Sequence, residues 1–221
     1  MATPRAKLRQ DTPPVETDPA TPEPFGPIVL RLPPAVKFTE EQFLELCGLN
    51  DELRIEINSR GELELMAPTF NNTSNRNIRI SARLQIWAET DDSGLAFESN
   101  AGFNLPNGAL RSPDASWVLK SRLAEIPETE RLRFSPICPD FVVELRSESD
   151  RLRDIQAKME EYLANGARLG WLIDPLDPRH RVYIYRPGVD VEVLEAPETL
   201  SGEPELPGFV LEMQRIWEQP I

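Results

Sequence analysis

Two acidic residues next to apolar segments are the side chains in this chain best suited to chemistry. Asp114 directly precedes the apolar segment 115–119, and Glu144 follows Phe-Val-Val at 141–143. A carboxylate near a buried strand costs free energy unless it is paired or bound to a metal ion. Carboxylate oxygens are also the ligands that Mg²⁺ prefers. The pattern predicts a hydrolytic site in which Asp114 and Glu144 hold Mg²⁺ or Mn²⁺.

Such a site also needs a cation to stabilise the attacking hydroxide or the developing charge on a phosphate. Lys158 borders a helical stripe of apolar residues and can therefore reach inward. Arg146 follows Glu144 by two residues, so on an extended strand it points to the same side. Spacing alone does not decide whether Lys158 or Arg146 supplies this cation.

The surrounding pattern alternates strands and helices. Segments 141–145 and 169–174 are almost continuously apolar, which is typical of strands covered on both faces. Helices are predicted from residue 71 to Trp87 and from Asp150, as N-cap, to Asn165, with Gly166 just past the end. We therefore predict an α/β fold with a mixed central sheet flanked by helices.

Two hairpins are predicted outside this centre. Segments 54–58 and 62–66 alternate apolar and polar residues on either side of Ser59-Arg60-Gly61, which predicts an N-terminal β-hairpin. Segments 182–185 and 191–194 predict a second, C-terminal β-hairpin. Short connections then predict that Asp114 and Glu144 lie on neighbouring strands.

Composition indicates one domain with an extension. Residues 1–27 are rich in Pro, Thr, Asp and Glu and cannot bury enough apolar surface, so we expect a flexible tail, followed by a single domain over 28–221. There is no apolar run long enough for a membrane span and no apolar signal core. Cys47 and Cys138 form no CxxC motif. These features predict a cytoplasmic protein with reduced thiols and no membrane partner.

The formal net charge of −13 argues against tight nonspecific binding of nucleic acid. Four arginines could still form a local basic groove, or could simply decorate a solvated helix face: Arg76, Arg79, Arg83 and Arg111. Both interpretations stay open at this point.

The chain resembles a known family, the Uma-type proteins, which are common in cyanobacteria and are grouped with the restriction endonucleases. The resemblance covers roughly residues 35–215. It is carried by Gly61 to Pro68, Pro113-Asp114-Ala115, Pro139 to Ser147, Lys158…Tyr162…Asn165-Gly166, and Gly170 to Pro175.

This resemblance implies a restriction endonuclease-like PD-(D/E)xK fold with Asp114 and Glu144 as metal ligands. Arg146 stands where such sites usually carry lysine, and the resemblance implies that the lysine has moved to the next helix, as Lys158. It also implies secondary candidates for the same space: Gln156, Glu98, Asn72 and Asn77.

The leading functional hypothesis is therefore a Mg²⁺-dependent endonuclease acting on DNA. A noncatalytic interaction or regulatory protein on the same fold is the first alternative, which the net charge and Arg146 favour. A metal-free hydrolase with paired carboxylates, as in glycosidases, is the second. We expect a homodimer, because two symmetric sites suit two DNA strands. We expect its interface to be formed by the apolar terminal hairpin and by the C-terminal residues Val210, Leu211, Ile216 and Trp217.

Overall fold

The computed structural model describes residues 26–33, 35–66, 68–130 and 133–218. Its centre is a six-stranded mixed sheet in which β8 and β9 run parallel and the other neighbours are antiparallel. The strands are, in spatial order, β11 (Glu192–Glu195), β10 (Arg181–Tyr185), β9 (Leu169–Asp174), β8 (Phe141–Leu145), β7 (Ala115–Leu119) and β4 (Gly94–Glu98).

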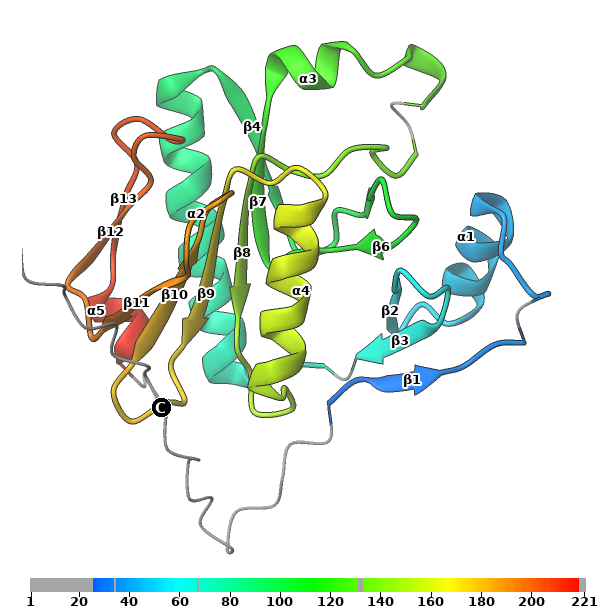
Figure 1. Ribbon diagram of the computed structural model, residues 1–221, viewed down its shortest axis with the longest axis horizontal. Coiled ribbons are helices and arrows are strands. Elements are labelled where there is room, and N and C mark those ends of the chain that lie inside the picture. Colours follow the sequence, from blue (N-terminus) through cyan, green and yellow to red (C-terminus); the bar gives the residue numbers. More distant parts are fainter. Residues whose placement is uncertain (1–25, 34, 67, 131–132, 219–221) are drawn as a thin grey trace, which may run out of the picture.

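Two long helices cover this sheet, one on each face (Figure 1). They are α2 (Asn71–Asp91) and α4 (Leu152–Ala164). Successive residues of a strand point to opposite faces. Accordingly, Phe141 and Val143 of β8 pack in the cluster that contains α2, whereas Val142 packs in the cluster that contains α4. Glu144, two residues after Val142, therefore faces α4.

A glycine allows α4 to pack closely on the sheet. A Cβ atom on Gly170 of β9 would lie only 2.5 Å from Cε of Met159 on α4. Met159 and Tyr162 are fully buried against the sheet as a result. This close packing fixes the distance between α4 and the central sheet, and with it the position of Lys158.

A second, five-stranded sheet lies beside the centre and is called here the N-terminal sheet (Figure 1). Its strands are, in spatial order, β1 (Ile28–Leu30), β3 (Leu63–Met66), β2 (Arg54–Ile57), β6 (Leu110–Arg111) and β5 (Phe103–Asn104). The predicted hairpin is confirmed, with Ile57 opposite Leu63 and Gly61 at a φ of 76° in the turn. It is one part of a larger sheet.

The remaining described elements are short: α1 (Glu40–Leu49), α3 (Lys120–Ala124), a single 3₁₀ turn at Glu128–Glu130, β12 (Thr199–Ser201), β13 (Val210–Glu212) and α5 (Gln214–Trp217). The C-terminal hairpin is also confirmed, as β10 and β11 at one edge of the central sheet. Leu211 and Ile216 are buried in the chain's own core. Leu211 and Ile216 are therefore unavailable for the expected dimer interface, whereas Val210, at 49% exposure, lies on the surface.

The predicted fold class, helix cap and tail have separate outcomes. The α/β class with a mixed, helix-flanked sheet is confirmed. Asp150 does not cap α4, because its carboxylate accepts a hydrogen bond from the backbone N–H of Ser147 at 2.8 Å. The predicted tail lies outside the described residues except for Gly26 and Pro27. None of the helices in the described part of the chain is long and apolar enough to cross a membrane.

Candidate active site

The end of the β7–β8 pair places the two predicted carboxylates beside each other. Ala115 pairs with Val143 across the sheet, so Asp114 at the start of β7 lies next to the end of β8. One oxygen of Asp114 accepts a hydrogen bond from the backbone N–H of Leu145 at 2.8 Å. Both carboxylates are buried, with exposed fractions of 8% for Asp114 and 6% for Glu144. The prediction that they lie on neighbouring strands is confirmed.

Asp114 is also held from α2 and from the N-terminal sheet. The side-chain amide of Asn77 donates to Oδ1 of Asp114 at 3.2 Å, and the guanidinium of Arg54 lies 3.6 Å from the same oxygen. Burial raises the pKa of Asp114, and the positive charges of Arg54 and Lys158 oppose that rise. Helix α2 thus contributes Asn77 to the site, as the family resemblance implied.

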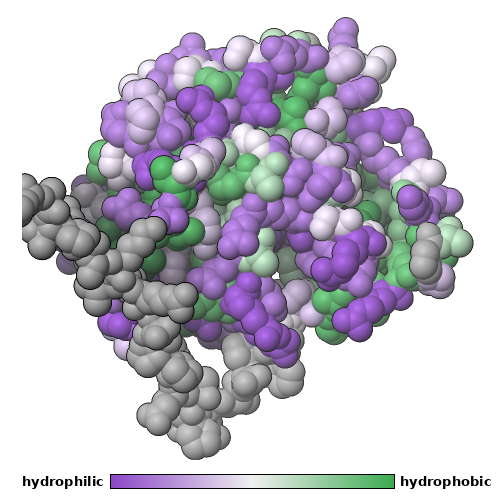
Figure 2. All heavy atoms as spheres, viewed as in Figure 1, coloured by the Kyte–Doolittle hydropathy of each residue, from purple (hydrophilic) through white to green (hydrophobic). Residues whose placement is uncertain are grey.

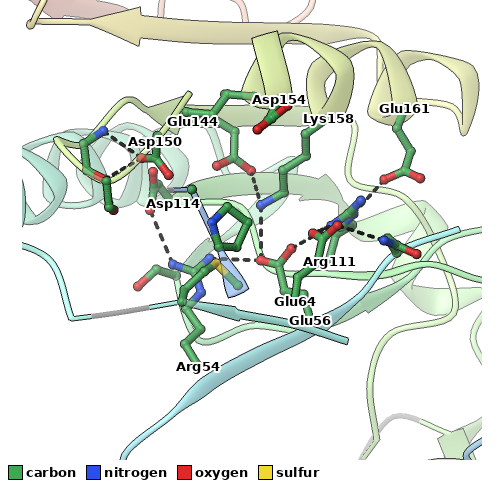
Figure 3. Close-up of a pocket in the computed structure, with 18 of the residues that line it drawn as sticks. Arg54, Glu56, Glu64, Arg111, Asp114, Glu144, Asp150, Asp154, Lys158 and Glu161 are labelled. Atoms are coloured by element: carbon green, nitrogen blue, oxygen red, sulfur yellow. Dashed lines mark hydrogen bonds and ion pairs between the residues drawn. The ribbon is translucent and has the colours of Figure 1, made fainter. Parts of the chain in front are cut away.

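Lys158 reaches Glu144 from α4. Its ammonium nitrogen lies 2.9 Å from Oε1 of Glu144 (Figure 3). The hydroxyl of Tyr162 donates to the same oxygen, also over 2.9 Å. Lys158 and Tyr162 are four residues apart and therefore share one face of the helix. Tyr162 is fully buried, and its hydroxyl is a partner of Glu144 that the sequence did not indicate.

Burial raises the pKa of Glu144 to about 7. The positive charge of Lys158 opposes this rise, while the neighbouring carboxylates of Asp114 and Glu56 add to it. In Lys158, burial alone would lower the pKa, but Glu144 and Glu56 outweigh that effect and raise it. The ammonium is therefore charged.

The N-terminal sheet adds a third buried carboxylate that sequence reasoning missed. Glu56 on β2 is 1% exposed, and its Oε1 lies 3.1 Å from the ammonium of Lys158. Burial alone would raise its pKa, but Lys158, Arg54 and Arg111 outweigh that effect and lower it. Its signal in the sequence was the pairing of Arg54 and Glu56 on one face of a strand whose other face carries Ile55 and Ile57.

Arg111 links the N-terminal sheet to α4. Its guanidinium lies 3.2 Å from Glu56 and 2.6 Å from Glu161 of α4, and it also pairs with Glu64 of β3. Arg111 is only 6% exposed. Its interactions are therefore internal ion pairs, and it is unavailable for a surface groove.

The other predicted arginines do not form a basic groove either. Arg76 is buried and donates to the backbone carbonyl of Ile216 at 2.7 Å. Arg79 donates to Asn75 on its own helix, and Arg83 is exposed. The basic-groove interpretation is therefore wrong, and Arg79 and Arg83 fit a helix surface.

Three further candidates lie away from the cluster that Asp114, Glu144, Glu56 and Lys158 form. Arg146 follows the end of β8 and pairs with the fully buried Asp174 at 2.8 Å. Glu98, at the end of β4, is exposed and accepts hydrogen bonds from Ser99 and Asn100. Gln156 is half-buried on α4, two residues before Lys158, and is not among the described residues that line the cavity discussed next.

A cavity of about 1140 Å³ opens over the cluster and is lined by both sheets and by α4. The described residues that line it include ten carboxylates and five basic side chains, so the excess charge is negative. Hydrophilic residues also predominate on the visible face of the molecule, where apolar side chains form only small separate groups (Figure 2). A phosphate group would need bound cations to enter such a cavity.

The donor set of Asp114 and Glu144 fits a magnesium ion. Both are hard oxygen donors, and both line the cavity beside each other. Within the described residues, no group of three or more His, Cys, Asp or Glu side chains is arranged to hold a metal ion. The fit is therefore to an ion that keeps several waters and takes only one or two carboxylates, as Mg²⁺ does.

Comparison with known proteins identifies the family of the chain. The family model Uma2, described as a putative restriction endonuclease, matches residues 40–214. The chain therefore belongs to this family, and the predicted resemblance is confirmed. A search among curated proteins finds no match.

One similar solved structure is the crystal structure of a putative nuclease belonging to DUF820 from Anabaena variabilis ATCC 29413. The two share 20% sequence identity with a TM-score of 0.67, and the match covers 81% of this chain and 97% of the other. At that identity the likeness shows the fold alone, which is the restriction endonuclease-like fold.

Proposed function

We propose that the protein is a Mg²⁺-dependent endonuclease that hydrolyses phosphodiester bonds in DNA. The observation that carries the proposal is the buried contact of Lys158 with Glu144, next to Asp114, at the floor of an open cavity. Family membership supports nuclease activity, and the two carboxylates supply the donor set for the metal. A bound Mg²⁺ would polarise a phosphoryl oxygen and lower the pKa of a water molecule.

The residues of the chain would divide the work. Asp114 and Glu144 hold the ion, and the backbone N–H of Leu145 keeps Asp114 oriented. Lys158 donates hydrogen bonds to the attacking oxygen or to a nonbridging phosphate oxygen, where negative charge grows. The water oxygen bonds to phosphorus as the bond from phosphorus to the leaving ester oxygen breaks. One water proton goes to solvent, and the leaving oxygen takes up a proton.

The direct test is cleavage of supercoiled plasmid DNA with Mg²⁺ or Mn²⁺. We expect nicked or linear product from the wild type and none from Glu144→Ala. A matched control is Glu195→Ala on β11, because Glu195 is exposed at the far edge of the central sheet. An inactive wild type with both metals, or an active Glu144→Ala variant, would contradict the proposal.

A second candidate is a noncatalytic interaction protein on the same fold. The net charge of −13 and the excess of carboxylates in the cavity favour it, because both disfavour a polyanionic substrate. Measurements of metal binding and of DNA cleavage distinguish the nuclease from the interaction protein. A protein that binds Mn²⁺ at neither carboxylate and leaves DNA intact would support the interaction protein.

A further inference from the structure

Lys158 lies between two carboxylates that belong to different sheets. Its nitrogen is 2.9 Å from Glu144 on β8 of the central sheet and 3.1 Å from Glu56 on β2 of the N-terminal sheet. Figure 3 shows the two acids on opposite sides of the ammonium group. The lysine side chain is 13% exposed, and Glu144 and Glu56 are its ion-pair partners among the described residues.

Glu56 is itself held rigidly. Its Oε1 accepts a hydrogen bond from the backbone N–H of Ser112 at 3.2 Å and lies 3.4 Å from the guanidinium of Arg54. Its other oxygen lies 3.2 Å from Arg111. A carboxylate fixed on three sides in this way is a stable anchor for a fourth partner, which is Lys158.

Glu144 cannot serve equally well as that anchor when a metal is bound. Its Oε1 already accepts from both Lys158 and Tyr162, and the proposed ion would draw on the same carboxylate. A divalent cation there also repels the nearby ammonium group. Without a second anion the lysine would be pushed away from the place where it is needed.

We propose that Glu56 is the positioning residue of Lys158, holding the ammonium group in place while Glu144 is committed to the metal. The catalytic importance of this contact rests on the proposed function, but the contact itself does not. The N-terminal sheet thereby becomes a working part of the site, since its β2 strand supplies the anchor.

The test uses the full-length, metal-free protein labelled with ¹⁵N-lysine and carrying Glu144→Gln, which takes the negative charge of Glu144 away from Lys158 and leaves Glu56 as its ion-pair partner. The chain has only four lysines, so their ammonium signals are easily separated, and Lys158→Ala assigns the one of interest. A held, buried ammonium exchanges its protons slowly and gives an observable ¹H–¹⁵N signal. We expect this signal in Glu144→Gln and its loss when Glu56→Gln is added to Glu144→Gln.

The matched control is Glu64→Gln. Glu64 lies directly opposite Glu56 on β3 and pairs with the same Arg111, but among the described contacts it does not reach Lys158. It should keep the signal. If Glu56→Gln does not fold, Glu56→Asp takes its place, because it keeps the charge and withdraws it by one methylene. The proposal is overturned if Glu144→Gln lacks the signal, if the folded protein with both Glu144→Gln and the Glu56 substitution keeps it, or if Glu64→Gln added to Glu144→Gln loses it too.

Cleavage kinetics give the second readout. Glu56→Gln should lower kcat by roughly tenfold to a hundredfold, with the KM for DNA nearly unchanged. In a Lys158→Ala background the same change should cost nothing further, because residues that act as a unit are not additive. A full additional loss in that background overturns the proposal. If the wild type does not cut DNA at all, the proposed function fails and the lysine signal still decides the role of Glu56.

Discussion

Strands β8 and β2 each bring one buried glutamate to Lys158, yet their sequences differ in kind. In β8, Glu144 sits in an otherwise apolar strand whose five residues are all buried. In β2, Glu56 alternates with isoleucines, a pattern usual for a strand with one face in solvent. The polar face of β2 is instead turned onto α4 and the cluster. A polar strand face can therefore form one wall of a buried charged cluster when a second layer covers it.

Removing Arg111 should have the largest effect, because it weakens the contact between the N-terminal sheet and α4. Arg111 is shared by carboxylates of both, and its loss leaves Glu56, Glu64 and Glu161 facing one another. We expect Arg111→Met to lower the free energy of unfolding by roughly 3–5 kcal/mol.

Chemical denaturation measures this effect, with Arg60→Met as the control. Arg60 lies in the same hairpin, but its side chain is 70% exposed, so its loss should cost at most about 1 kcal/mol. Equal losses in the two variants would show that the ion pairs of Arg111 do not tie the sheets together.

Lys158→Ala should have the next largest effect. Removing a charge that stabilises a transition state costs roughly a hundredfold or more in rate. Arg146→Ala should instead lower the melting temperature and keep most of the cleavage rate, because Arg146 pairs with the buried Asp174. Plasmid cleavage and thermal melting of both variants make this comparison. An inactive Arg146→Ala beside a fully active Lys158→Ala would assign the catalytic cation to Arg146.

The raised pKa of Glu144, about 7, predicts a pH dependence of stability. Between about pH 4.5 and 7 the folded protein keeps a proton on Glu144 that the unfolded chain has released, so this contribution is present at low pH and is lost as the pH rises through 7. Relative to Glu144→Gln, the metal-free wild type should lose on the order of 2–3 kcal/mol between pH 5 and 8. Denaturation of both proteins across this range checks it. Parallel pH profiles would show that Glu144 is charged throughout.

Tyr162→Phe should have the smallest effect. It removes one donor from Glu144 but keeps the buried ring, so we expect a loss of about 1 kcal/mol in stability. The cleavage rate should fall less than it does in Lys158→Ala. Denaturation and cleavage assays measure the two effects. A rate loss as large as that of Lys158→Ala would make the hydroxyl, and not the ammonium, the main partner of Glu144.

The central sheet and its two carboxylates could be predicted from the sequence because burial on both faces produces long apolar runs. An acid that follows such a run, as Glu144 does, stands out against it. The helical stripe of α4 likewise indicated that Lys158 could reach inward. These features are local, and local patterns are what a single sequence displays.

The rest depends on contacts between distant segments. Glu56 and Lys158 are 102 residues apart, and nothing near either residue indicates the other. Arg111 and Arg76 looked like surface charges because their partners, Glu161 and the carbonyl of Ile216, come from elsewhere in the chain. Asp150 had the right type and spacing for a helix cap, but Ser147 offers it both a backbone and a hydroxyl donor.

The central claim, that Asp114 and Glu144 form a divalent-ion site beside Lys158, is tested most directly by crystallography with Mn²⁺. Anomalous scattering locates manganese without any assumption about activity. We predict a single strong anomalous peak within ligand distance of both carboxylates, with Lys158 still in contact with Glu56. The absence of a peak there, or a peak only at other acidic residues of the cavity, would contradict the account.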